Sequence, residues 1–95
     1  MGKLRDQIEA YPDVPTIPTA ATEESYVAGT QSLAKAFLKA LDEWKDFDDS
    51  KDWKESTLGS ELFHRADIPE AVKNEATGNM VGVAAHAAYQ AWKGN

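Results

Sequence analysis

Apolar residues recur at helical spacing across residues 22–47. Successive steps of three or four residues place them on one broad stripe, which predicts a long amphipathic helix. Thr22 is suited to cap its N-terminus through the side-chain hydroxyl, and Glu23 and Glu24 put negative charge where the helix dipole favours it. The stripe consists of Tyr26, Val27, Thr30, Leu33, Ala34, Phe37, Leu38, Leu41 and Trp44. No other part of the chain has so long a pattern, so we expect the core to form around this helix.

A shorter helical pattern follows at 57–66. Ser56 or Thr57 is suited to cap it, and Glu61 and Arg65 stand four residues apart in the order that favours an ion pair. Its apolar positions are Leu58, Leu62, Phe63 and Ala66. These four residues predict a helix with one buried face.

The last predicted helix spans 68–92 and opens with Pro69 and Glu70 in its first turn. Either it runs unbroken, or it ends at Gly78 as a C-terminal cap and a new helix starts at Asn79. Its second half carries small residues at a spacing of three or four, which permits close approach to another helix. That face consists of Met80, Val83, Ala84, Ala87 and Ala91.

The N-terminal part, 1–21, predicts a short helix followed by an extended strap. Prolines recur every third residue after the helix, which is the period of polyproline II. They are Pro12, Pro15 and Pro18, and Val14 and Ile17 form a second, apolar edge. Three interpretations remain open: the strap packs on its own long helix, it packs on a neighbouring subunit, or it is a ligand for an aromatic groove. The last is disfavoured because the basic residue that usually flanks such ligands is missing.

These patterns together predict an all-α fold: a small helical bundle of three main helices (22–47, 57–66 and 68–92) in a single domain spanning 1–95. Ninety-five residues are enough for one hydrophobic core. The chain has no cysteine, no apolar run near the roughly 20 residues that span a bilayer, and no apolar leader. We therefore expect a cytoplasmic protein with no membrane partner.

Charge narrows the choice of partner. Sixteen acidic and ten basic residues give a net charge of −6, which argues against direct binding of nucleic acid because phosphate contacts need clustered Lys and Arg. A basic protein surface is a partner that this charge would attract, and ordinary solubility is the plain alternative. Small acidic domains include inhibitors that imitate the charge of nucleic acid, such as phage-encoded counter-defence proteins; the analogy concerns composition alone.

Candidate catalytic and metal-binding groups are few. Two histidines, no cysteine and no glycine-rich phosphate loop leave little from which to build an active site, so we predict no enzyme activity, no catalytic residue and no cofactor. Glu61 and His64 match half of a di-iron site whose second half is missing. A calcium loop after Asp46 is disfavoured because its glycine and glutamate positions hold Lys51 and Thr57. We expect His64 on the surface, and His86 on or near the face of small residues.

The most unusual composition lies at 42–55, where seven acids and three lysines surround three large aromatic residues. Either this stretch is a solvated connection, or its aromatics pack into the core, or it is a partner interface in which aromatic anchors stand among charges. The candidate partner-binding residues are Asp42, Trp44, Asp46, Phe47, Asp48, Asp49, Asp52 and Trp53. The sequence thus favours a non-enzymatic protein-interaction module, a small acidic inhibitor or regulator. The alternative is an assembly component that forms homo-oligomers through the strap and the alanine-rich last helix.

Overall fold

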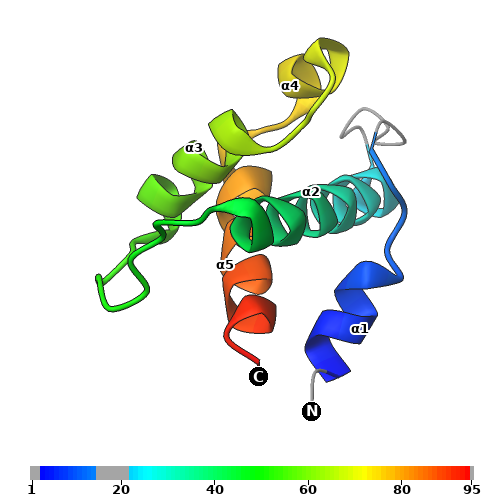
Figure 1. The fold of residues 1–95 in the computed structure, drawn as a ribbon. Helices are drawn as coiled ribbons and strands as arrows, with labels where there is room; N and C mark the ends of the chain where they lie inside the picture. The colour runs from blue at the N-terminus through cyan, green and yellow to red at the C-terminus, as the bar shows by residue number, and fades with distance from the viewer. Residues whose placement is uncertain (1–2, 15–21, 95) are drawn as a thin grey trace.

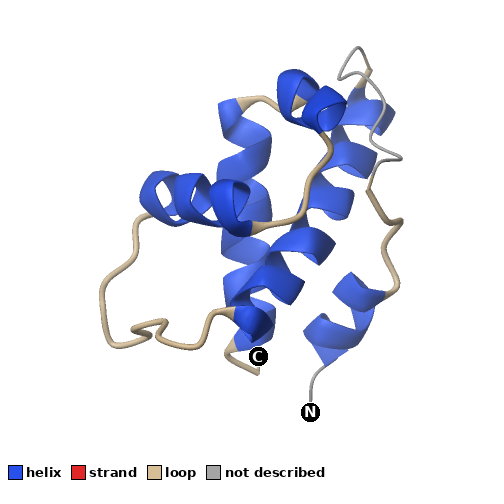
Figure 2. Ribbon diagram, turned by 45° about the horizontal axis from the view of Figure 1, so that its top comes forward, coloured by secondary structure: helices blue, strands red, loops and turns tan. Residues whose placement is uncertain are grey.

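The computed structural model describes residues 3–14 and 22–94, and this part of the chain is helical without any strand (Figures 1 and 2). The helices are α1 (Lys3–Glu9), α2 (Glu23–Glu43), α3 (Glu55–Arg65), α4 (Glu70–Glu75) and α5 (Gly78–Trp92). The all-α prediction is confirmed. The described residues thus form a small helical bundle that contains one more helix than the four predicted.

Helix α5 lies at the centre of the bundle, because it contacts α1, α2 and α3 (Figure 1). Its packed face is made almost wholly of small residues that are at most 1% exposed: Met80, Ala84, Ala85, Ala88 and Ala91. From α2, the residues Leu33, Phe37 and Leu41 are equally well buried. Small side chains let helix axes approach closely, so α5 can pack against several neighbours at once. Helix α2 likewise contacts α1, α3 and α5, so the core forms between α2 and α5.

Two predicted core positions face outward instead. Val27 of α2 is 47% exposed and Val83 of α5 is 44% exposed. In α5, alanines stand on both sides of the helix, so the sequence offers little contrast between its faces, and the predicted face is rotated from the observed one. Ala85 and Ala88 are buried in place of Val83 and Ala87.

Gly59 marks the closest approach between α3 and α5. A Cβ atom at this position would lie 3.0 Å from Val81 Cγ1 and 3.2 Å from the Val81 carbonyl oxygen. Because backbone stands within that distance, a larger side chain would force the two helices apart. The glycine in α3 therefore fixes how tightly α3 packs on the centre of the bundle.

The long helix predicted over 22–47 is shorter in the structure at its C-terminal end. Thr22 caps α2 as expected, accepting a hydrogen bond from the Ser25 backbone N–H at 3.1 Å. However, α2 ends at Glu43, and Trp44 has extended backbone angles (φ −85°, ψ 93°). Residues 44–47 were predicted to be helical, and that prediction is wrong. Beyond the helix, Trp44 and Phe47 pack together in the aromatic cluster described below.

The caps of the later helices also differ from the predictions. Helix α3 begins at Glu55 after Lys54, so neither Ser56 nor Thr57 caps it. The predicted helix 68–92 is divided: α4 ends at Glu75, and α5 begins at Gly78. Thr77 caps α5 by accepting a hydrogen bond from the Met80 N–H at 3.2 Å. The break lies where the alternative placed it, but Gly78 opens the new helix and does not close the old one.

The N-terminal arm packs on the remainder of the chain. Ile8 of α1 is completely buried, and Val14 is partly buried against the core. Lys35 of α2 holds the start of the strap, since its ammonium group donates to the Tyr11 carbonyl at 3.2 Å and pairs with Asp13 at 2.5 Å. The first residues of the strap thus lie along their own α2. The predicted continuation through Ile17 falls outside the described residues.

Candidate functional site

The loop between α2 and α3 carries seven of the eight candidate residues, all but Asp42 of α2, and is packed on the C-terminal end of α5. Phe47 stands at the centre of an aromatic cluster, with its ring centroid 5.1 Å from that of Trp92 and 5.9 Å from that of Tyr89. On its other side lie Trp44 at 4.7 Å and Trp53 at 5.5 Å. Tilted and edge-to-face ring pairs of this kind contribute about 0.5–1.5 kcal/mol each beyond their buried area. The five rings therefore fasten the loop to α5.

Hydrogen bonds fix the backbone at the tip of the same loop. The Asp48 carboxylate accepts from the Ser50 backbone N–H at 3.0 Å and from the Ser50 hydroxyl at 2.6 Å. Trp53 Nε1 donates to the Asp48 carbonyl at 2.9 Å, and the Tyr89 hydroxyl donates to the Asp49 carbonyl at 3.3 Å. Bonds from Ser50 to the ionised carboxylate lower the pKa of Asp48 below its ordinary value. The loop thus has a defined conformation, held both from within and from α5.

Cationic side chains border the aromatic cluster. The Arg65 guanidinium lies 3.8 Å from the centre of the Trp44 ring, and it also pairs with Glu61 at 2.9 Å. Lys51 lies 4.4 Å from the centre of the Trp53 ring. Cations over aromatic faces are attracted by the ring quadrupole, by about 0.5–1 kcal/mol at exposed sites. Arg65 therefore ties the last turn of α3 to Trp44, the residue directly after α2.

The structure separates the eight predicted residues into two groups. The three aromatic residues turn inward and are partly buried: Trp44, Phe47 and Trp53. The five acidic residues stay exposed: Asp42, Asp46, Asp48, Asp49 and Asp52. We call residues 42–55 the acidic loop; its seven acids and three lysines give it a net charge of −4. Among these acids, Asp42 is set apart because it forms an ion pair with Arg5 of α1.

Sequence reasoning did not find the residues that hold the loop in place. Tyr89 and Trp92 supply two of the five rings, and Arg65 supplies the cation over Trp44. Tyr89 and Trp92 stand three residues apart in α5, which indicates that they share one side of that helix. Nothing in the spacing shows that the other half of the cluster comes from 44–53, because that pairing depends on how the helices pack.

Both histidines lie at exposed positions. His64 is exposed, as predicted. His86 is also exposed, so it is not a buried core group; its Nδ1 lies 3.5 Å from Glu55 Oε1 and its Nε2 lies 3.1 Å from Gln90 Nε2. Within residues 3–14 and 22–94, no group of three or more His, Asp or Glu side chains could hold a metal ion.

Comparison of the chain with protein-family models, curated proteins and solved structures finds no match. Among the helices described, none is long and apolar enough to cross a membrane. The geometry and charge of this chain's own residues are therefore what indicate its function.

Proposed function

We propose that the protein is a non-enzymatic interaction module that binds a basic protein surface through the acidic loop. The observation that carries the proposal is the division within this loop: its aromatic rings pack on α5 while its carboxylates face solvent. Charged groups of one sign attract an oppositely charged partner over several ångströms and increase the rate of encounter. A fixed arrangement of these groups also lowers the entropy lost on binding.

The role of the aromatic residues in this proposal differs from the one their composition suggests. Trp44, Phe47 and Trp53 contact one another, Phe47 also contacts Trp92 of α5, and all three are partly buried, so most of their surface is already occupied within the chain. They act as a rigid base, and the carboxylates make the contact with the partner. Ring surface that remains exposed adds apolar contact at the margin of the interface.

The assembly alternative receives less support. The alanines that would form an oligomer contact on α5 are largely buried in the protein's own core, Ala84, Ala88 and Ala91 among them. The described start of the strap, as far as Val14, packs on its own α2. A second chain would therefore have to displace contacts that already exist.

The test is a charge comparison at matched net charge. One variant carries Asp46→Asn, Asp49→Asn and Asp52→Asn in the acidic loop; the control carries Glu24→Gln, Glu70→Gln and Glu75→Gln at exposed sites elsewhere. Each removes three carboxylates and changes the net charge from −6 to −3. Asp48 is left intact because it orders the loop.

Binding is measured by calorimetry to a helical peptide that carries arginine and lysine on one face. We expect the loop variant to bind at least about tenfold more weakly than the control. Both affinities should decrease as the salt concentration is raised until the Debye length is shorter than about 10 Å. Equal losses in the two variants would mean that only net charge matters. That result, or an affinity indifferent to salt, would refute the proposal. If the loop variant does bind more weakly than the control, affinity capture from the native host with the same two variants identifies the partner.

A further inference from the structure

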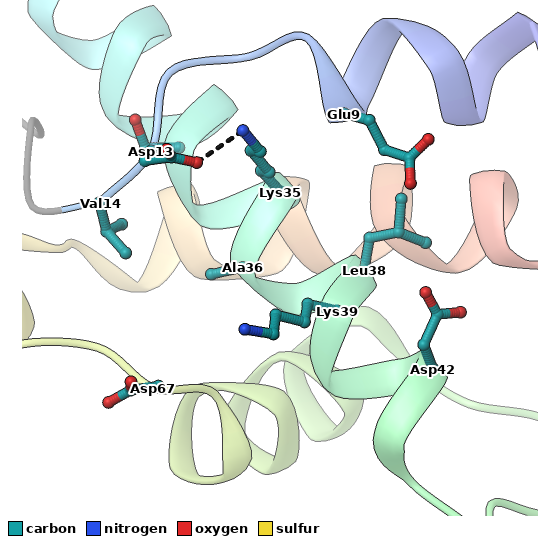
Figure 3. A pocket seen from close by; sticks show the side chains of 10 residues that line it. Glu9, Asp13, Val14, Lys35, Ala36, Leu38, Lys39, Asp42 and Asp67 are labelled. Atoms are coloured by element: carbon teal, nitrogen blue, oxygen red, sulfur yellow. Dashed lines mark ion pairs between the residues drawn. The ribbon is translucent and has the colours of Figure 1, made fainter.

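A cleft of about 520 Å³ lies between the N-terminal arm and α2, away from the aromatic cluster (Figure 3). Its volume falls within the range typical of small-molecule sites. It is lined from the arm by Glu9, Asp13 and Val14, from α2 by Ser32, Lys35, Ala36, Leu38, Lys39 and Asp42, and from the α3–α4 connection by Asp67. Three separate segments of the chain therefore meet at this cleft.

Most of the charged groups that line the cleft are already paired within the chain. Asp13 pairs with Lys35, as the dashed line in Figure 3 shows. Arg5 pairs with Asp42 and, at 3.8 Å, with Glu9. These carboxylates and the Lys35 ammonium group are therefore less available to a ligand.

One cation and one anion remain. Neither Lys39 nor Asp67 forms an ion pair within the described part of the chain, and both are exposed. Figure 3 shows Lys39 extending from α2 toward the side of the cleft on which Asp67 lies. The two groups come from different elements and have opposite charge, so the cleft offers complementary partners for a molecule that carries both charges.

Two further features point to the chemistry of that molecule. Val14, Ala36 and Leu38 give the cleft an apolar wall. Ser32, which is 1% exposed, also lines it, and its hydroxyl has no hydrogen-bond partner among the described residues. A buried hydroxyl without a partner is unfavourable, and rotation about χ1 is the small movement that would turn it toward a ligand.

We propose that this cleft binds a small aliphatic zwitterion, with the chemistry of a free α-amino acid. The ligand carboxylate pairs with the Lys39 ammonium group and accepts from the Ser32 hydroxyl. Its ammonium group pairs with Asp67, and its aliphatic side chain packs on the apolar wall. A ligand that lacks either charge loses one of the two charge-assisted contacts, so the site discriminates against it. This site shares only Asp42 with the acidic loop, and that carboxylate is already paired with Arg5.

The test is a titration of the labelled protein followed by amide chemical shifts. The probes are leucine, 4-methylpentanoate (the same skeleton without the ammonium group) and 3-methylbutylamine (the same skeleton without the carboxylate). We expect leucine to produce saturable shifts at amides of the cleft with a Kd of roughly 1 mM, in the range of weak small-ligand complexes. Each single-charge probe should bind at least about tenfold more weakly, which corresponds to the loss of one charge-assisted contact.

Variants assign the two charges. Lys39→Met and Asp67→Asn should each weaken leucine binding at least about fivefold. Lys73→Met and Glu75→Gln remove one charge of each sign outside the cleft and should leave binding unchanged. All four side chains are exposed or partly exposed. Unchanged chemical shifts of amides far from each substitution verify that the variant is folded. Absence of saturable shifts, equal binding of all three probes, or equal effects of cleft and control variants would overturn the proposal. None of these outcomes bears on the acidic loop, whose test uses a basic peptide.

Discussion

Asp48 shows how one residue type can serve structure and charge together. Its side chain accepts two hydrogen bonds from Ser50, which close a small turn, while its carboxylate remains exposed to solvent. Aspartate is favoured in such turns because its short side chain reaches the backbone N–H two residues on. The negative charge of the acidic loop is therefore part of what gives the loop its shape.

Ser50→Ala should raise the pKa of Asp48 toward its ordinary value of 3.8. The hydroxyl bond is the largest cause of the lowered pKa, and the bond from the Ser50 N–H remains in the variant. Because the pKa of Asp48 is lower in the folded state, its contribution to stability is present above the ordinary pKa and is lost as pH falls through the lowered one. Carboxyl carbon shifts followed between pH 2 and 6 measure the change. Ser60→Ala, at an exposed site in α3, is the control and should leave Asp48 unaffected.

Phe47→Ala should destabilise the protein by about 2–4 kcal/mol, because the ring contacts four other aromatic side chains and its loss leaves a hole between the loop and α5. Urea unfolding followed by far-UV circular dichroism measures the free energy of unfolding. The neighbouring exposed residue provides the comparison: Asp46→Ala should change stability by less than about 0.5 kcal/mol. Similar effects of the two substitutions would show that the cluster does not fasten the loop.

At the scale of elements, two glycines test how closely α3 and α5 pack, because one is crowded by the neighbouring helix and the other is not. Gly59→Ala should destabilise by about 1–3 kcal/mol, since the new methyl group meets Val81 side chain and backbone at 3.0–3.2 Å. Gly82→Ala should stabilise by about 0.5–1 kcal/mol, because its nearest neighbour, Glu55, lies at an ordinary 3.9 Å and alanine favours the helix. Thermal unfolding of the two variants side by side gives the comparison. A gain in stability from both would show that the helices are not in close contact at Gly59.

The sequence predicted elements well where apolar and polar residues alternate with strong contrast. In α2, Leu33, Phe37 and Leu41 form the buried face that helical spacing indicates. In α5 the spacing correctly predicted Met80, Ala84 and Ala91 as buried but misplaced Val83, because alanine on several sides gives little contrast. Trp44 could not be placed by local pattern either: it continues the apolar stripe of α2, yet it lies outside the helix and packs on the rings of Phe47 and Trp53.

The candidate site was predictable in composition and not in arrangement. The acids of the loop can be identified by counting charges, and all five candidate aspartates are exposed. Which rings face inward depends on Tyr89 and Trp92, about 40 residues away along the chain. The cleft beside Lys39 has no sequence signature at all, because Asp67 and Val14 approach it from segments that no local pattern relates.

At the scale of the whole molecule, stability and charge are carried by different parts. The buried residues form one cluster contributed by all five helices and the connections between them. The ion pairs, by contrast, lie at partly exposed positions such as Arg5 with Asp42 and Arg65 with Glu61. Exposed ion pairs contribute about 0–1 kcal/mol to the free energy of unfolding. Surface charges can therefore be changed to suit a binding partner with little effect on the stability of the fold.

The N-terminal arm provides the clearest test of this separation. Ile8→Ala should destabilise the protein by about 2–4 kcal/mol, because the side chain is completely buried and its removal leaves a cavity where α1 meets the bundle. Arg5→Ala, one turn away, breaks both of its ion pairs but should have an effect of at most about 1 kcal/mol. Urea unfolding gives the free energy and the m-value of each variant. An unchanged midpoint for Ile8→Ala would mean that α1 does not belong to the cooperative core. A reduced m-value would instead show that the arm is already detached in the variant's native state, because less surface would then be exposed on unfolding.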